Sequence, residues 1–173
     1  VTLATVLANP EDELPSIVYW LMGSLADASW SGVGWLALAA VPALALIVVL
    51  RFQVNLLALG DEEARALGCD PQRLRAVLVV AVALATAGTV AVAGIIGWIG
   101  LVVAHMARLL VGADHAASIP AAGLLGATLL VLVDTAARSA TAQELPLSVL
   151  TAVIGTPVFL WLLARNGGLA RDV

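Results

Sequence analysis

The chain has 173 residues, of which 62% are hydrophobic and only 12% are charged, and its formal net charge is −4. Its mean hydropathy is +1.05. Because soluble domains carry about a quarter charged residues, this composition indicates an integral membrane protein. All eight basic residues are arginine, and the lack of lysine excludes a Walker A loop, whose lysine contacts nucleotide phosphates. The single cysteine, Cys69, excludes an internal disulfide and a cysteine-cluster metal site. Because the chain begins with Val1 rather than methionine, we expect it to be a fragment.

A short apolar segment, residues 16–25, precedes the long hydrophobic runs. At about ten residues it is too short to cross a bilayer, so it suits a re-entrant or interfacial helix. Tyr19 and Trp20 fit the headgroup level of a membrane, and Trp30 and Trp35 continue the aromatic belt. We therefore predict one short helix here, at a membrane face.

Five hydrophobic runs follow, each about 17–25 residues long, which is the length that a helix needs to cross a bilayer. The sequence therefore predicts an all-α polytopic membrane protein with about five transmembrane helices. Pro42 and Pro157 fall inside the first and the last run and should kink those helices. The predicted spans are 34–52, 75–93, 96–112, 120–138 and 147–165.

Glycines recur in these runs, where small residues let membrane helices pack closely. Gly94, Gly97 and Gly100 do not form the dinucleotide-binding pattern G-x-G-x-x-G, and no strand is expected before them. We interpret their spacing as a helix break or a close-packing surface. The glycines expected at helix contacts are Gly88, Gly94, Gly97, Gly100, Gly123 and Gly126.

The longest polar segment, residues 53–75, lies between two of the runs and must be a loop at one membrane face. Asp61 can cap a short helix, with Glu62 and Glu63 in the first turn, where the helix dipole favours negative charge. Arg65 follows Asp61 by one helical turn, so the two side chains can pair along one face.

The end of this polar segment also carries helix punctuation. Gly68 fits the left-handed position that ends a helix, and Asp70 followed by Pro71 predicts a second cap and a second short helix. Two short helices between spans would make a rigid projection on which another protein could push. An ordinary solvated loop is the alternative, and the pattern alone does not decide between them.

The distribution of arginines predicts the orientation in the membrane. If residues 53–75 face the cytoplasm, seven of the eight arginines lie inside or at inner helix ends, and only Arg138 lies outside. This places the C-terminus in the cytoplasm and the acidic N-terminal segment outside.

Two groups within the runs could carry chemistry. His105 lies inside a predicted span, where an ionisable group is a functional candidate, although a neutral histidine bonded to a neighbouring helix explains it better. Asp134 and Arg138 are one helical turn apart and can pair, either as a self-neutralising couple or with Arg138 meeting an acidic partner. We find no catalytic triad, paired carboxylates or metal cluster in the sequence, so an enzyme centred on His105 and Asp134 is the weakest alternative.

Several segments, taken in order, resemble the C-terminal half of a FecCD-type permease. Permeases of this type are the membrane subunits of ABC importers for iron–siderophore complexes, haem and vitamin B12. The most specific matches are residues 55–68 and 144–159. The remaining matches are residues 19–25, 93–110, 114–115 and 132–138.

The resemblance implies a ten-helix type II ABC importer permease, of which residues 1–173 form one transmembrane domain from the end of the fifth helix onward. Residues 53–75 would be its cytoplasmic coupling loop, and Arg138 would dock the substrate-binding protein. The translocation path would pass near Trp20, Met22, Gly23 and Ser24. The ATPase-coupling residues would be Gly60, Asp61, Glu62, Glu63, Ala64, Arg65, Leu67 and Gly68.

The same resemblance implies the partners and the cofactors. An ABC ATPase dimer would bind ATP and magnesium at the cytoplasmic face, while this chain would bind no cofactor or metal. The other partners would be a substrate-binding protein outside, a second permease copy and the lipid bilayer of the inner membrane, with no nucleic acid. We expect import of iron–siderophore complexes, with vitamin B12 or haem as alternative substrates. A non-transporting membrane anchor or assembly subunit is the alternative from another class.

Overall fold

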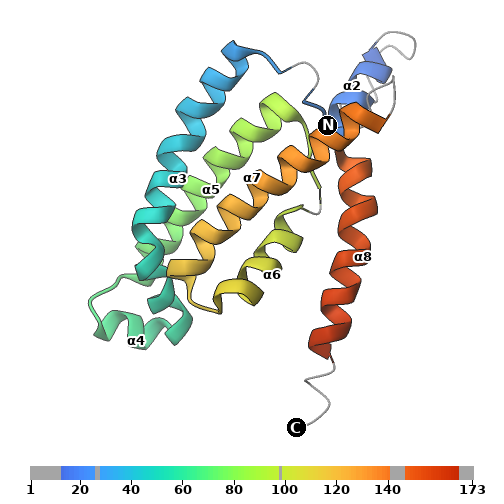
Figure 1. Ribbon diagram of the computed structural model, residues 1–173. Coiled ribbons are helices and arrows are strands. Elements are labelled where there is room, and N and C mark those ends of the chain that lie inside the picture. The colour runs from blue at the N-terminus through green and yellow to red at the C-terminus, as the bar shows by residue number, and fades with distance from the viewer. Residues whose placement is uncertain (1–12, 26–27, 98, 141–146, 168–173) are drawn as a thin grey trace.

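The computed structural model describes residues 13–25, 28–97, 99–140 and 147–167, and within these ranges every regular element is a helix (Figure 1). The predicted all-α fold is therefore confirmed. The helices are α2 (Glu13–Met22), α3 (Trp30–Leu59), α4 (Asp61–Ala66), α5 (Pro71–Ala93), α6 (Ile99–Val111), α7 (His115–Ala140) and α8 (Leu147–Gly167).

Three of the described helices, α3, α5 and α7, are long and apolar enough to cross a membrane. Helix α6 corrects the prediction of a span at 96–112, because it has only 13 residues. At a rise of about 1.5 Å per residue it measures about 20 Å, against a hydrocarbon core of about 30 Å. The fifth predicted run forms α8, in which the stretch Leu147–Pro157 is apolar but also short. Pro42 and Pro157 lie inside α3 and α8, as predicted.

The predicted short helix near the start is α2, which has 10 residues. Trp30 begins α3 with 91% of its surface exposed, and Trp35 is 73% exposed. The N-terminal end of α3, where both residues stand in the chain, is at the end of the bundle that also carries α2 (Figure 1).

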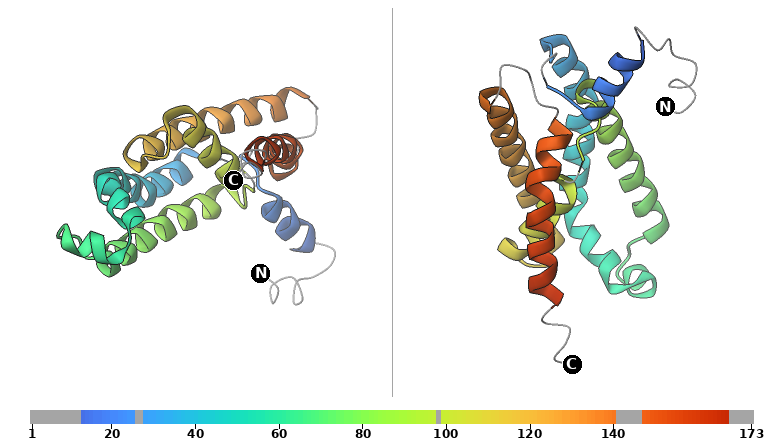
Figure 2. Two further views of the ribbon diagram at one scale, coloured as in Figure 1. Left: turned by 90° about the horizontal axis from the view of Figure 1, so that it is seen from below. Right: turned by 90° about the vertical axis from the view of Figure 1, so that its right-hand side faces the viewer.

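Helix α3 packs against both α5 and α7, and the shorter α6 lies beside α7 (Figure 1). Seen from below, α8 appears end-on while α3, α5 and α7 appear elongated, so these three are tilted relative to α8 (Figure 2). A Cβ atom added at Gly88 on α5 would lie 3.3 Å from Ala39 Cβ on α3, which confirms close packing there. At Gly100 and Gly123 nothing lies within 4 Å of such an atom, so those two glycines do not make the expected contacts in the described structure.

Most of the apolar surface remains exposed. In each of the three long helices only 11% of the most apolar window is buried, which is typical of helices that face lipid or further membrane helices. A small core lies where α7 and α8 meet and consists of Val133, Ala137 and Leu147.

Candidate functional site

Helix α4 projects between α3 and α5 at one end of the bundle (Figure 1). Gly60 separates it from α3 with a φ of +114°, a backbone conformation that favours glycine. Gly60 is also the N-cap of α4, without a side-chain hydrogen bond, and Asp61 is the first helical residue. The prediction that Asp61 caps this helix is therefore wrong.

The carboxylate of Asp61 instead binds the guanidinium of Arg75 on α5. Arg75 donates two hydrogen bonds, of 3.0 Å to Oδ2 and 2.6 Å to Oδ1. The predicted pair with Arg65 is present, but its 3.8 Å separation is longer. Sequence spacing could not reveal Arg75, because the pair forms only when α4 folds back over the first turn of α5.

These interactions change the titration of Asp61. The hydrogen bonds from Arg75 contribute most to lowering the pKa of its carboxyl group, and the nearby charges of Arg75 and Arg65 lower it further. The carboxylate therefore stays charged at any pH near neutrality, and the link between α4 and α5 persists.

The end of α4 follows the predicted pattern. Gly68 has a φ of +81°. Its N–H donates to the Arg65 carbonyl at 2.9 Å, and the Cys69 N–H donates to the Ala64 carbonyl at 2.9 Å. This pair of bonds is a Schellman motif, in which glycine takes the left-handed position. Ala64 is fully buried, so α4 is seated firmly against its neighbours.

The second predicted cap is confirmed, but it starts a different element. The Asp70 side chain accepts hydrogen bonds from the N–H groups of Gln72 and Arg73, at 3.1 and 3.3 Å, and Pro71 is the first helical residue. The helix that begins there is the long α5, so the projection contains one short helix rather than two. Leu67 lies between α4 and this cap and is 61% exposed.

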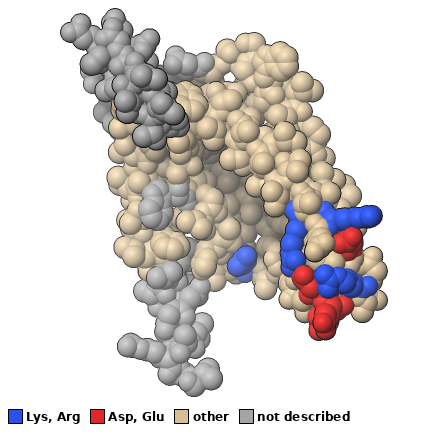
Figure 3. Space-filling model, turned by 180° about the vertical axis from the view of Figure 1, so that it is seen from behind, with Lys and Arg blue, Asp and Glu red and all other residues tan. Residues whose placement is uncertain are grey.

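Charged side chains gather at the α4 end of the molecule on the face drawn in Figure 3. Glu62 and Glu63 are exposed on α4 itself. A surface of this kind suits a complementary polar partner, whereas the remainder of the described surface on that face is largely uncharged (Figure 3).

The turn after α2 forms a second site at the other end of the bundle. Gly23 has a φ of +70°, and its carbonyl accepts a 3.0 Å hydrogen bond from the N–H of Leu147 on α8. The N–H of Ser24 donates to the carbonyl of Ala93, the last residue of α5, at 3.1 Å. Trp20 and Met22 are 43% and 38% exposed on α2. Their place near a translocation path stays a prediction.

The helix break predicted at the glycine series is confirmed. Helix α5 ends at Ala93, and Gly94 adopts a φ of +70°. A Cβ atom at Gly94 would collide with the carbonyl oxygen of Trp20 and lie 2.9 Å from the Cα of Gly23. The approach of α2 therefore requires glycine here.

Arg138 lies close to the same turn. Its Nε donates to Asp134 Oδ2 at 2.9 Å, which confirms the predicted pair, and its Nη2 donates to the carbonyl of Leu25 at 3.1 Å. The Arg138 side chain is 49% exposed. The bond to Leu25 was not predicted, because a contact across more than a hundred residues leaves no local pattern.

Two further candidates, His105 and Asp134, lie on α6 and α7. His105 is half-buried on α6, and Asp134 is bound to Arg138. Among the residues that the structure describes, no group of three or more His, Cys, Asp or Glu could hold a metal ion.

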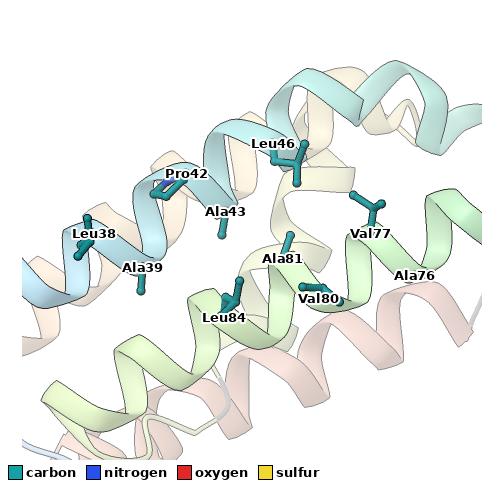
Figure 4. Close-up of a pocket in the computed structure, with 10 residues that line it drawn as sticks. All are labelled: Leu38, Ala39, Pro42, Ala43, Leu46, Ala76, Val77, Val80, Ala81 and Leu84. Carbon is teal, nitrogen blue, oxygen red and sulfur yellow. The ribbon is translucent and has the colours of Figure 1, made fainter.

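An apolar groove of about 570 Å³ lies between α3 and α5 (Figure 4). Residues 38–46 of α3 and 76–84 of α5 supply its lining, which consists entirely of alanine, valine, leucine and proline. Such a lining suits hydrocarbon or another helix rather than a charged ligand.

Taken together, the long apolar helices, the projecting α4 and the two polar ends define a polytopic all-α membrane protein. The model of the FecCD transport family matches residues 1–165, and the chain belongs to this family.

The chain is similar to several permease proteins of importers. The chain is 39% identical to the molybdate import system permease protein MolB of Haemophilus influenzae, covering 96% of this chain and 50% of that protein. It is 43% identical to the vitamin B12 import system permease protein BtuC of Vibrio cholerae, over 88% of this chain and 46% of the relative. It is 42% identical to the hemin transport system permease protein HmuU of Yersinia pestis, over 91% of this chain and 48% of that protein. The chain thus spans about half the length of the curated relatives that it matches.

One solved structure is also similar. It is described as a metal-chelate type ABC transporter in an inward-facing conformation, and its TM-score is 0.87 at 38% identity. The match covers 95% of this chain and 53% of that one.

Proposed function

We propose that this chain is part of the membrane permease of an ATP-driven importer that carries iron–siderophore complexes across the cytoplasmic membrane. The observation that carries the proposal is α4, an ordered helix that projects from the bundle between two membrane-length helices. Its seat is fixed by the buried Ala64, the Schellman motif and the Asp61–Arg75 bonds. An ordinary solvated loop has no need of such a rigid support.

In this proposal α4 contacts an ABC ATPase dimer in the cytoplasm, where ATP and magnesium bind. The distribution of arginines favours that orientation. Closure of the ATPase dimer displaces α4, and the hydrogen bonds between Asp61 and Arg75 transmit this displacement to α5. The permease then changes between outward and inward access by a rigid-body movement of its helices. A second permease copy completes the pathway.

Arg138 docks the substrate-binding protein at the outer face. Its bonds to Asp134 and Leu25 hold the guanidinium in one place, while its half-exposed position leaves it open to a carboxylate of the partner. Replacing Arg138 with Glu should weaken docking by an amount between the ~1 kcal/mol of exposed pairs and the ~2–5 kcal/mol of buried ones. The affinity should also fall with added salt. An unchanged affinity together with poor membrane insertion would assign Arg138 a structural role.

The substrate is the least constrained part of the proposal. The similar solved structure is described as a metal-chelate type transporter, which favours an iron chelate. The relatives named for molybdate, for vitamin B12 and for hemin make those compounds the alternatives. In every case the substrate would pass near Trp20, Met22, Gly23 and Ser24.

The test is reconstitution of the complete transporter, with its ATPase and binding protein, in proteoliposomes. We expect ATP-dependent uptake of siderophore-bound radioactive iron, and no uptake with an ATPase that lacks its Walker lysine. Uptake of only cyanocobalamin, haem or molybdate would replace the substrate but keep the permease function. If no ATPase copurifies with the chain and none of these compounds is taken up, a non-transporting membrane anchor is favoured instead.

A further inference from the structure

The side chain of Asn55, in the last turns of α3, reaches the turn between α6 and α7. Its Nδ2 donates to Asp114 Oδ1 at 2.5 Å. Its Oδ1 accepts from the backbone N–H of His115 at 2.8 Å and lies 3.0 Å from His115 Nδ1. One amide group thus holds two consecutive residues that follow it by 59 and 60 positions.

The chemistry of the partners fixes the orientation of this amide. A carboxylate only accepts hydrogen bonds, so the NH₂ group of Asn55 faces Asp114. A backbone N–H only donates, so the Asn55 oxygen faces His115, whose Nδ1 must then carry a proton. Asparagine uses its donor and its acceptor at the same time, which neither an aliphatic side chain nor a carboxylate can do.

The residues that Asn55 holds also begin α7. The Asp114 carboxylate accepts from the N–H of Ala116 at 2.9 Å, and the Asp114 carbonyl accepts from the N–H of Ser118 at 2.8 Å. The hydrogen bond from Asn55 contributes most to lowering the pKa of Asp114, followed by the bond from Ala116. Asn55 therefore binds the charged residue that caps the N-terminus of α7, rather than a residue in an irregular loop.

These contacts of Asn55 lie close to the start of α4. Helix α3 ends at Leu59, little more than one turn after Asn55, and α4 begins directly after Gly60. On its other side α4 is bound to α5 through Asp61 and Arg75. Helix α4 is thus joined to α5 by an ion pair, and the end of α3 that precedes it is joined to the start of α7 by an amide.

We propose that Asn55 is a positioning residue that makes the start of α7 move together with α4. The inference rests on the proposed function, in which α4 receives the push of the ATPase. Without the amide, α4 and α5 can shift while α6 and α7 stay behind. With it, both helix pairs respond to the same displacement.

A distance measurement between α4 and the α6–α7 turn tests whether the contacts of Asn55 hold these two parts of the structure together. Spin labels are placed at the exposed positions Ala66 and Ala113, as Ala66→Cys and Ala113→Cys, with Cys69→Ser removing the native thiol. In the assembled transporter we expect one narrow distance distribution that is the same with and without a non-hydrolysable ATP analogue. In Asn55→Ala the distribution should broaden, and it should shift when the analogue binds.

Uptake per ATP hydrolysed, normalised to inserted protein, tests the consequence. Asn55→Ala should lose coupling, and so should Asn55→Asp, which removes the donor and faces Asp114 with a second negative charge. The double variant Asn55→Asp with Asp114→Asn restores one donor and one acceptor between the two positions and keeps the acceptor for His115. We expect it to recover coupling, which a merely structural loss would not do. Gln53→Ala, at an exposed site on the same helix, is the matched control.

The outcomes separate the inference from the function on which it rests. Loss of coupling in both single variants, with recovery of coupling in the double variant, supports the positioning role of Asn55. If Asn55→Ala matches Gln53→Ala in label distances and coupling, or if the double variant recovers nothing, the inference is overturned while transport by the parent stands. If the parent itself shows no ATP-dependent uptake, the proposed function fails and this inference fails with it.

Discussion

Asp61 and Gly94 show what a single residue's neighbours in the sequence can and cannot reveal. The spacing of Asp61 from Arg65 predicted a pair that exists, yet the closer partner is Arg75, on a different helix. The glycine at 94 was expected at a helix break or a close contact, and the structure supplies the reason in the Trp20 carbonyl. Local rules therefore identified both positions, but the partners depend on the tertiary fold.

The Asp61–Arg75 pair gives a prediction for pH. Because Arg75 lowers the pKa of Asp61 in the folded state, the pair stabilises the fold above the unfolded value of about 3.9. That stabilisation is lost as the pH falls through the lower, folded pKa. A spin label on α4, at Ala66→Cys, should be immobile at neutral pH and become mobile in strong acid. In the Asp61→Asn variant the label should be mobile at both pH values. In the control variant Glu62→Gln the label should behave as it does in the parent.

Gly94→Ala should destabilise the protein, because the new methyl group meets the Trp20 carbonyl and the residue must hold a φ of +70°. Strain of this kind is worth about 1–3 kcal/mol, so the thermal unfolding temperature in detergent should fall. Gly100→Ala, where the new atom meets nothing within 4 Å, should leave the temperature unchanged or raise it. Equal behaviour of the two variants would contradict the contact between α2 and Gly94.

Among the elements, the C-terminal end of α4 and the cap of α5 were predicted well, but the N-cap of α4 and the extent of α6 were not. Gly68, Asp70 and Pro71 act through their immediate neighbours, so their roles can be read from sequence. The break before α6 begins at Gly94, which lies against the backbone of Trp20 on α2, and hydropathy cannot indicate such a contact. The Asn55 contact with the start of α7 is equally non-local, although Asn55 and Asp114 both lie in segments that resembled the family.

The double variant Glu62→Ala with Arg65→Ala tests α4 as an element. Neither residue lies in a membrane-length helix, so insertion should be unchanged, whereas uptake by the complete transporter should no longer follow ATP hydrolysis. The measurement compares both rates in proteoliposomes, with Gln72→Ala, exposed just beyond the projection, as the control. Transport at the parental rate would make α4 an ordinary surface element and favour the anchor hypothesis.

At the scale of the whole molecule, the composition was sufficient to predict an all-α membrane protein, and the resemblance was sufficient to predict the family. The packing of α5 against α3 depends on contacts such as that of Gly88 with Ala39, for which the sequence offers only a list of small residues. The predicted cytoplasmic C-terminus and outer N-terminal segment include residues outside those that the structure describes. Helix α8 itself runs back toward the α4 end (Figure 1).

Orientation in the membrane can be measured with the native Cys69, which lies between α4 and α5. From the distribution of arginines we expect a membrane-impermeant maleimide to label it in inverted vesicles and to leave it unlabelled in intact cells. The Cys69→Ser variant gives the background. Labelling in intact cells would reverse the orientation and with it the assignment of α4 to an ATPase.

The turn after α2 has a consequence for which changes in chain length the protein can tolerate. Gly23, Ser24 and Leu25 are consecutive, and their backbone atoms bind Leu147, Ala93 and Arg138 respectively, on three different helices. Inserting or deleting one residue here would put all three bonds out of register at once. Because the bonds use main-chain atoms, substitution at Ser24 leaves its link to Ala93 possible. We therefore expect this position to tolerate changes of residue type, but not a change in the number of residues between α2 and these three bonds.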